Sequence, residues 1–196
     1  MADLERLRVN LEERGIACRC FTTAREAADY LDREIDGTTV GIGGSETVKA
    51  MGLYPRLSAH NQVFWHWEGG RLTDAARAEV YLSSVNALAE TGEIVNIDGN
   101  GNRIASTVYG HKRVYFVVGQ NKLEPDFDRA LWRARNVAAP RRAQAMGRKT
   151  PCAGKADRCY NCKSPDRICR GLMVLWGRPM MMEHMEVVLV GETLGL

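Results

Sequence analysis

Four cysteines near the C-terminal end form the clearest chemical pattern in the chain. Short loops can bring four such sulfurs to one centre, where four thiolates satisfy tetrahedral zinc. The same donor set can hold a four-iron cluster. The pattern therefore predicts a metal site, with zinc favoured and an iron–sulfur cluster as the alternative, while metal-free thiols or disulfides are a third interpretation. The predicted ligands, spaced C-x6-C-x2-C-x6-C, are Cys152, Cys159, Cys162 and Cys169.

The segment around these cysteines, residues 150–170, has too few large apolar side chains to build a core of its own. Basic residues are interspersed with the cysteines and would partly offset the negative charge of four thiolates. Metal binding can supply a large share of the folding free energy of such a segment. We therefore expect residues 150–170 to fold around their four sulfurs.

Residues 40–45 read Val-Gly-Ile-Gly-Gly-Ser, a pattern typical of a buried strand that breaks into glycines and opens a helix. Glycines allow the backbone to approach a ligand, and free amides at the start of a helix favour a phosphate or a carboxylate. The dinucleotide fingerprint fails because its third glycine would fall on Glu46. We therefore predict no NAD, and a small-anion loop stands beside a purely structural turn as the two interpretations.

A second polar turn, Asp98 to Arg103, follows the strand predicted over residues 93–97. Its residues tolerate the positive φ angles of tight turns, so a surface hairpin or a strand-to-helix turn is one interpretation. In the other interpretation its Asn and Arg side chains donate hydrogen bonds to a small anionic ligand. Residues 82–87 add hydroxyl and amide groups at another predicted strand end, and we expect both segments to border one pocket.

The four histidines show neither metal-ligand spacing nor a neighbouring nucleophile motif, so none is predicted to be catalytic. His66 lies in the aromatic run Val-Phe-Trp-His-Trp of residues 63–67. Such a density of aromatic side chains favours a strand core or a subunit interface. A homodimer is one assembly that such a run would serve.

The elements that must position these groups alternate between strands and helices. This alternation is typical of an α/β protein with a largely parallel sheet covered by helices on both faces. Active sites of such sheets lie beyond the carboxyl ends of the strands. Apolar runs predict strands over residues 38–42, 62–67, 93–97 and 113–118, and helical patterns cover residues 24–34, 45–51 and 125–138.

The length of 196 residues favours one domain with an appendage. We expect a single α/β domain over residues 1–196, which begins with an amphipathic helix over residues 1–14. The cysteine loop, residues 150–170, is then inserted before two last strands over residues 172–176 and 186–190.

The composition excludes several classes of protein. A net charge of +3, with arginines spread along the chain, argues against nucleic-acid binding. No apolar stretch approaches the roughly 18 to 20 residues of a membrane span, and the N-terminal pattern is unlike a signal peptide. We therefore expect a cytoplasmic protein without a membrane partner, in which cysteines stay mostly reduced.

The segments that carry these motifs read GIGGSETVKAMGL, YLSSVNALAETGEIVNIDGNGNR, VVGQNKL and TPCAGKADRCYNCKSPDRICR. Together and in this order they resemble the lactate-utilisation (LUD) domain family, over roughly residues 1–196. The resemblance implies a fold similar to that of sugar-phosphate isomerases and CoA transferases, with three α/β layers around a mostly parallel sheet. It also implies an association with operons that oxidise lactate to pyruvate alongside iron–sulfur proteins.

The resemblance further implies a ligand pocket assembled from several segments. A CoA transferase would need a glutamate nucleophile near a glycine turn, and Glu90 is the nearest candidate. Thr91 departs from the Asn or Ser that is common in the family motif, so Glu90 is a weak catalytic candidate and an ordinary loop carboxylate is preferred. The implied pocket residues are Gly43, Gly44, Ser45, Ser83, Ser84, Asn86, Asp98, Asn100, Arg103, Asn121 and Lys122.

The leading functional hypothesis is a component of a redox system for lactate or related carboxylate metabolism. It would bind a small carboxylate or phosphate and work with an iron–sulfur redox protein as its partner. One alternative is a stand-alone enzyme similar to sugar-phosphate isomerases or CoA transferases. Another is an assembly or scaffold protein that is stabilised by a metal and docks a partner through its cysteine loop.

Overall fold

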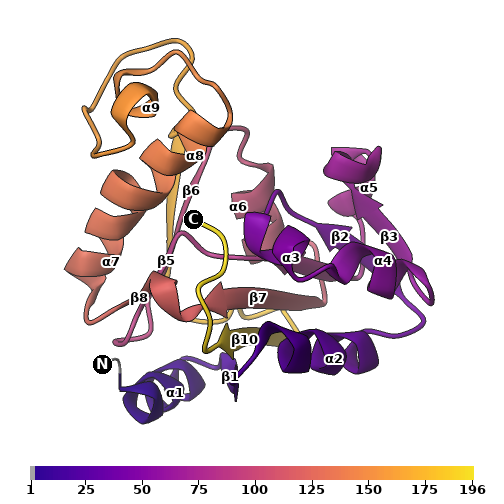
Figure 1. Ribbon diagram of the computed structural model, residues 1–196. Helices are drawn as coiled ribbons and strands as arrows, with labels where there is room; N and C mark the ends of the chain where they lie inside the picture. Colours follow the sequence, from indigo (N-terminus) through magenta and orange to yellow (C-terminus); the bar gives the residue numbers. More distant parts are fainter. Residues whose placement is uncertain (1–2) are drawn as a thin grey trace.

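Six parallel strands form the central sheet of the protein (Figure 1). The computed structural model describes residues 3–196. The last strand of the chain lies second in the sheet, between the first strand and β7, so the two ends of the sequence are joined by strand pairing. In spatial order the strands are β1 (Ala17–Phe21), β10 (His184–Val190), β7 (Arg113–Gly119), β4 (Val80–Ser83), β2 (Thr39–Ile42) and β3 (Gln62–Trp65).

A second, smaller sheet of four strands packs beside the central one. Its β5–β6 and β6–β9 pairs are antiparallel and its β5–β8 pair is parallel. The prediction that the run at residues 93–97 belongs to the parallel sheet was therefore wrong. In spatial order the strands are β8 (Leu123–Glu124), β5 (Ala87–Ala89), β6 (Ile94–Asp98) and β9 (Gly171–Leu175).

The helices between residues 24 and 75 cover one face of the central sheet and its β3 edge. Leu31 and Leu57 are fully buried there against strand residues such as Val40. Burial of an apolar side chain of this size contributes roughly 1.5–3 kcal/mol. These elements are α2 (Ala24–Glu34), α3 (Glu46–Ala50), α4 (Leu53–Ser58), the 3-10 turn η1 (His66–Glu68) and α5 (Leu72–Ala75).

The opposite face of the central sheet packs against α1 (Leu4–Glu13), α6 (Asn102–Val108) and the second sheet. Leu7 and Leu11, on one side of α1, are fully buried in this cluster. The protein is thus a three-layer α/β structure with a mostly parallel central sheet, as the sequence predicted.

A long helical segment covers the outer face of the second sheet (Figure 1). It consists of α7 (Phe127–Arg133), a π-helical turn η3 (Ala134–Ala138) and α8 (Ala139–Ala145). The predicted helix over residues 125–138 therefore continues past Pro140, which lies in the first turn of α8, where a missing backbone N–H is tolerated. Small residues such as Ala130 and Ala134 face the sheet and allow a close approach.

The chain then forms α9 (Pro151–Lys155) and the cysteine loop, at the top of Figure 1. Residues 156–170 contain neither a helix nor a strand. No helix formed by residues 3–196 has the length and apolar character needed to cross a membrane.

The glycine at position 41 shows how closely the elements approach one another. A Cβ atom on Gly41 would lie within 3 Å of the Ala75 carbonyl group at the end of α5. A residue with a larger side chain at this position would have to push α5 away from β2. Ala75 of α5 and Val40 of β2 are both buried in the present packing. The packing of α5 on the sheet thus fixes this glycine, and no ligand is required to explain it.

Candidate functional site

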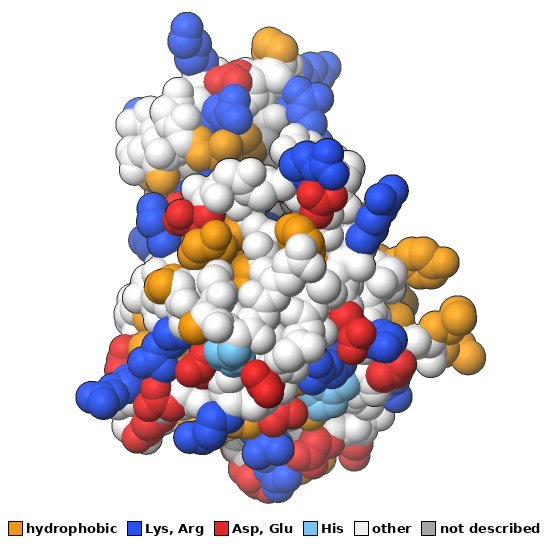
Figure 2. Space-filling view, turned by 90° about the vertical axis from the view of Figure 1, so that its right-hand side faces the viewer, with side chains coloured by type: hydrophobic (Ala, Val, Ile, Leu, Met, Phe, Trp, Pro, Cys, Tyr) orange, Lys and Arg blue, Asp and Glu red, His pale blue; other side chains and the backbone are white. Residues whose placement is uncertain are grey.

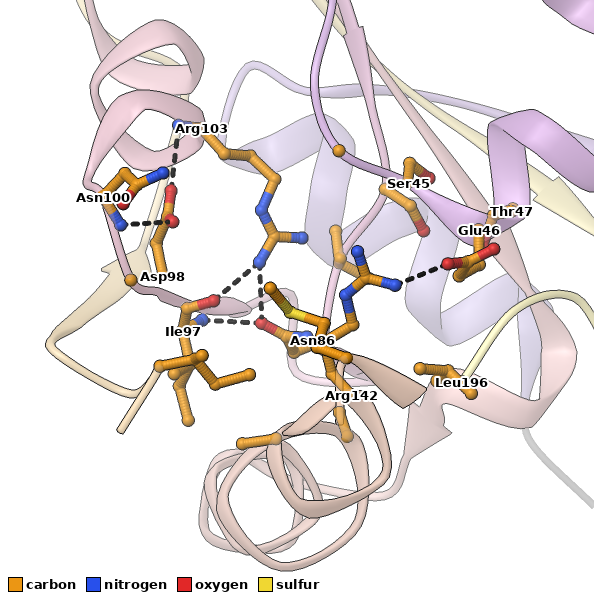
Figure 3. A pocket seen from close by; sticks show the side chains of 18 of the residues that line it. Ser45, Glu46, Thr47, Asn86, Ile97, Asp98, Asn100, Arg103, Arg142 and Leu196 are labelled. Carbon is orange, nitrogen blue, oxygen red and sulfur yellow. Dashed lines mark hydrogen bonds and ion pairs between the residues drawn. The ribbon is translucent and has the colours of Figure 1, made fainter. Parts of the chain in front are cut away.

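A polar cavity of about 380 Å³ opens where the carboxyl ends of β2, β4 and β7 meet the second sheet (Figure 3). Four chain segments far apart in sequence contribute to its wall: residues 44–47, 84–86, 97–103 and the helical segment 138–148. Lys122, in the 3-10 turn η2 (Gln120–Lys122) that follows β7, also lines it, as do His66, Trp67, Ile168 and Leu196. This is the position at which parallel α/β sheets place their ligands.

Lys122 is the most deeply buried cation of the cavity, with 4% of its surface exposed. Its Nζ donates hydrogen bonds to Thr47 Oγ1 at 2.8 Å and to Ser84 Oγ at 2.9 Å. Within residues 3–196 it takes part in no ion pair with a carboxylate. Burial, reinforced by Arg133 and Arg103, lowers the pKa of Lys122 to about 7.

Arg103 enters the same cavity from the start of α6 (Figure 3). One of its guanidinium nitrogens donates to Asn86 Oδ1 at 3.1 Å and to the Ile97 carbonyl oxygen at 2.6 Å. The other nitrogens of the planar group remain able to donate to a ligand. Burial lowers the pKa of Arg103, and the nearby Asp98 carboxylate opposes that effect.

The Asp98 carboxylate is occupied by backbone amides and holds the turn that presents Arg103. Its Oδ1 accepts from Asn100 N at 3.2 Å, and its Oδ2 accepts from Arg103 N at 2.9 Å and from Ile104 N at 3.2 Å. The Arg103 and Ile104 amides lie in the first turn of α6 and would otherwise lack partners, so Asp98 supplies acceptors to the start of that helix from outside it. The segment is therefore a strand-to-helix turn, which was one of the two sequence interpretations, and it borders the cavity.

Arg142 of α8 lines the cavity on the side opposite Arg103 (Figure 3). Its guanidinium donates to Glu46 Oε1 and stacks over the Trp67 ring, 5.1 Å from the ring centre. His66 lies beside them, and its Nδ1 is buried without a partner among residues 3–196. Burial, with the positive charge of Arg142, lowers the pKa of His66 and keeps the imidazole neutral at neutral pH.

The family model of the LUD domain matches residues 4–190, nearly the whole chain. The chain belongs to the LUD-domain family. A crystal structure of a DUF162 family protein from Deinococcus radiodurans superimposes with a TM-score of 0.57 and 15% sequence identity, covering 96% of each chain. At that identity the likeness shows the fold alone. A comparison with proteins of curated function found no match.

Most residues that the sequence placed in the ligand pocket of this LUD domain line the cavity together. Sequence reasoning missed two further lining residues, because His66 lies in an aromatic run that resembles core and Arg142 has no motif around it. Glu46 and Thr47 also line the cavity. The sequence could have indicated them, because they directly follow the predicted residue Ser45. The predicted residues that line the cavity are Gly44, Ser45, Ser84, Asn86, Asp98, Asn100, Arg103 and Lys122.

The other predicted pocket residues lie just behind the wall of the cavity. Gly43 faces Tyr81 and Ser83, and its carbonyl oxygen accepts from Trp65 Nε1 at 3.1 Å. Ser83 is fully buried and donates to the backbone. Asn121 Oδ1 accepts from Leu194 N at 3.0 Å, which ties the last residues of the chain beside Lys122. These residues support the wall and do not line it.

The weak catalytic candidate Glu90 lies in the β5–β6 turn, against α1. Its Oε1 accepts from Asp3 N at 3.3 Å, and its carbonyl oxygen accepts from Asn10 Nδ2 at 2.6 Å. Glu90 is not among the residues that line the Lys122 cavity. Its contacts are those of a loop carboxylate that fixes the N-terminal helix.

The cysteine loop of this LUD domain borders a second cavity, of about 310 Å³. All four predicted metal ligands line that cavity, and all four are free thiols. The structure does not show the predicted metal site, however: residues 3–196 contain no group of three or more His, Cys, Asp or Glu side chains arranged to hold a metal ion.

Thiol groups do not attract one another strongly enough to converge on one centre, and three of the four sulfurs hydrogen-bond to other groups. Cys169 Sγ accepts from Arg167 at 3.3 Å, Cys159 Sγ accepts from the Asn161 amide at 3.4 Å, and Cys152 Sγ lies 3.3 Å from the Thr150 hydroxyl. The donor set itself is that of a tetrahedral four-thiolate site. The four cysteines thus fit a zinc ion or an iron–sulfur cluster in chemistry and share one cavity, although their sulfurs do not form one coordination sphere.

Proposed function

We propose that this LUD domain binds a small carboxylate or phosphate anion in the Lys122 cavity, as the binding component of a redox system for lactate or related carboxylate metabolism. The observation that carries the proposal is Lys122, a nearly buried ammonium-bearing side chain with hydroxyl neighbours and no carboxylate partner within residues 3–196. A buried cation without a counter-charge is costly, and a bound anion would remove that cost.

Arg103 offers a guanidinium group in a fixed orientation to a ligand in the cavity. Its guanidinium is held by Asn86 and Ile97 through one nitrogen, so the plane of the group is fixed before a ligand arrives. Fixed guanidinium groups bind carboxylates and phosphates through paired, charge-assisted hydrogen bonds. Each such bond contributes roughly 1.5–3 kcal/mol.

The size of the cavity agrees with a small metabolite. A volume of about 380 Å³ lies near the lower end of the range typical of small-molecule sites. The wall is also polar for much of its area, as it would be for a ligand with few carbon atoms. Lactate and pyruvate are the ligands that family membership suggests first.

The four-cysteine loop would supply the redox connection of the proposed system. If Cys152, Cys159, Cys162 and Cys169 hold an iron–sulfur cluster, it would lie next to the anion, because Ile97, Ala139 and Ile168 line both cavities. Basic side chains of this loop are exposed, and blue side chains gather at the top of the molecule in Figure 2. A partner redox protein would then be expected to present an acidic surface.

The test is a calorimetric titration of the purified protein with lactate, pyruvate, ribose 5-phosphate and an acyl-CoA. We expect a small anion to bind the wild type at millimolar concentration or below. Arg103→Ala should weaken binding about tenfold to a hundredfold, in line with the loss of one charge-assisted contact. The matched control is Arg71→Ala, which removes an arginine that is paired with Asp74 and does not line the cavity.

The outcomes separate the candidate functions. Binding that falls in Arg103→Ala and not in Arg71→Ala supports the proposal. Turnover of the acyl-CoA or of the sugar phosphate would replace it with an enzyme of the related folds. If no anion binds the wild type, the proposal fails and a scaffold role takes its place.

A further inference from the structure

We propose that Lys122 is a nucleophile that forms an imine with the carbonyl group of a small 2-oxo carboxylate bound in the cavity. This inference rests on the anion site proposed above and names the class of its ligand. Lysine amines react in this way with carbonyl compounds when a protein holds them desolvated beside other cations. The cavity meets both conditions, because Lys122 is nearly buried and shares the wall with Arg103.

The hydrogen bonds around Lys122 orient its amine for attack. A neutral amine has two N–H groups, and Nζ has two hydroxyl acceptors, Thr47 Oγ1 at 2.8 Å and Ser84 Oγ at 2.9 Å. Thr47 in turn donates to the Leu194 carbonyl oxygen at 3.3 Å, so its own hydrogen points away from Nζ. With both hydrogens taken, the lone pair of the amine remains available to a ligand in the cavity that Lys122 lines.

The protonation state agrees with this geometry. Burial lowers the pKa of Lys122 to about 7, with help from Arg133 and Arg103. A substantial fraction of the side chains is then neutral at pH 7, against very few for an ordinary lysine of pKa about 10.4. The charged form attracts the anion, and the neutral form supplies the nucleophile.

The carboxylate and the carbonyl group of the ligand must both fit within the cavity. Arg103 and Lys122 line that one small cavity. A ligand small enough for it that places its carboxylate on Arg103 carries its carbonyl carbon only a few bonds away. A 2-oxo carboxylate has this arrangement, whereas a 2-hydroxy carboxylate can bind but has no carbonyl carbon to react.

The step is balanced without any co-reactant. Nζ forms a bond to the carbonyl carbon, and the π electrons move to the oxygen, which takes a proton that leaves the nitrogen. The carbon–oxygen bond of this adduct then breaks, the nitrogen lone pair forms the C=N bond, and the oxygen leaves as water with the second proton of the amine. Thr47 and Ser84 touch Nζ and are placed to carry these protons. Nothing is oxidised or reduced.

The experiment traps the imine by reduction. The wild-type protein is incubated with pyruvate and sodium cyanoborohydride, digested, and analysed by mass spectrometry to map every modified lysine. We expect Lys122 to be modified at least ten times faster than Lys112, which is exposed and paired with Glu79. An excess of lactate should slow the modification of Lys122, and acetone, which lacks a carboxylate, should modify it at least ten times more slowly than pyruvate.

Two variants serve as matched controls. Lys122→Arg keeps the positive charge and removes the amine, so the fast modification should disappear, while Lys112→Arg should leave it unchanged. If Lys122→Arg fails to fold, the mapping of the wild-type protein still decides the question.

The failures are distinguishable from those of the anion site. If calorimetry shows that pyruvate binds and Lys122 is modified no faster than Lys112, the imine is excluded and the anion site stands. If none of the anions in the titration binds and Lys122 is not modified, both proposals fall. Modification of Lys122 by acetone as fast as by pyruvate would overturn the assignment of a carboxylate ligand.

Discussion

The Lys122 cavity and the cysteine loop are neighbours that share three lining residues, yet they are built in opposite ways. The polar groups of the cavity stand at strand ends and helix starts, where backbone hydrogen bonds and two hydrophobic clusters fix them. Residues 156–170 of the loop contain neither a helix nor a strand and are held largely by side-chain contacts. The cavity is therefore formed before any ligand arrives, whereas the loop has the construction of a segment that a ligand would organise.

The largest experimental effect is expected when a metal is removed from the cysteine loop. In protein purified without oxygen we expect a metal to be bound by the four cysteines. Its removal by a chelator should make residues 156–170 more mobile. Cleavage by trypsin after Lys155, Arg158 or Lys163 should then be at least about tenfold faster, because binding free energy of several kcal/mol is lost. Cys162→Ser should have the same effect, and Cys20→Ser, at an exposed cysteine of β1, should not.

The cavity should respond differently to that treatment. Its residues are fixed by the sheets, so anion affinity measured by calorimetry should change by less than about threefold on metal removal. The contrast between the two regions is wrong if protein prepared without oxygen holds no metal and its loop is cleaved at the same rate with and without chelator. The four cysteines would then be ordinary thiols.

A second, smaller effect is expected when the support of Arg103 is removed. Asp98→Ala leaves the amides of residues 100, 103 and 104 without their acceptor, which should cost about 1–3 kcal/mol of stability in a urea titration. It should also weaken anion binding several-fold, because Arg103 loses its fixed position.

The matched control is Asp126→Ala. Asp126 caps α7 by accepting from Arg129 N at 2.8 Å and does not line the cavity. Its loss should cost about 1 kcal/mol of stability and leave anion affinity unchanged. Equal losses of affinity in both variants would mean that general destabilisation, and not the position of Arg103, controls binding.

The smallest effect is a change in how stability depends on pH. The pKa of Lys122 is lowered to about 7 in the folded protein, against about 10.4 in an unfolded chain. Between these values the unfolded state binds more protons, so the contribution of Lys122 to stability rises with pH across that window. Below about pH 7 the side chain is charged in both states, and its contribution stays at its least favourable level.

Lys122→Met removes this dependence. Relative to the wild type, the variant should be most favoured near pH 7 and progressively less favoured toward pH 10, as measured by urea denaturation at a series of pH values. Lys112→Met, at an exposed lysine, should show a nearly constant difference. Parallel curves for Lys122→Met and the wild type would show that the ammonium group is not buried in solution.

Much of the fold was determined by the sequence alone, because the signals are local. The apolar run at residues 113–118 predicted β7, and the helical pattern at residues 24–34 predicted α2, which begins at the Thr23 cap. Caps and side-chain periodicity act over a few residues, so they can be read from the sequence. Ordered motifs of this kind also carried the resemblance to the LUD domain, which the family model confirms over residues 4–190.

Other features were decided only by the tertiary structure, because they depend on pairing between distant segments. The run at residues 93–97 has the same apolar character as the strands of the parallel sheet, yet β6 pairs with β5 and β9 in the second sheet. Strand partners depend on long-range packing, which local propensity does not determine.

The same distinction separates the two chemical regions. The sequence named the four cysteines and eight of the residues that line the cavity, but it could not show that His66 and Arg142 line it too. Nor could it show that Lys122 is buried between Thr47 and Ser84 without a carboxylate partner in residues 3–196. Burial and the absence of a counter-charge arise from chain segments as much as 75 residues apart, and these two conditions lower the pKa of an ordinary lysine.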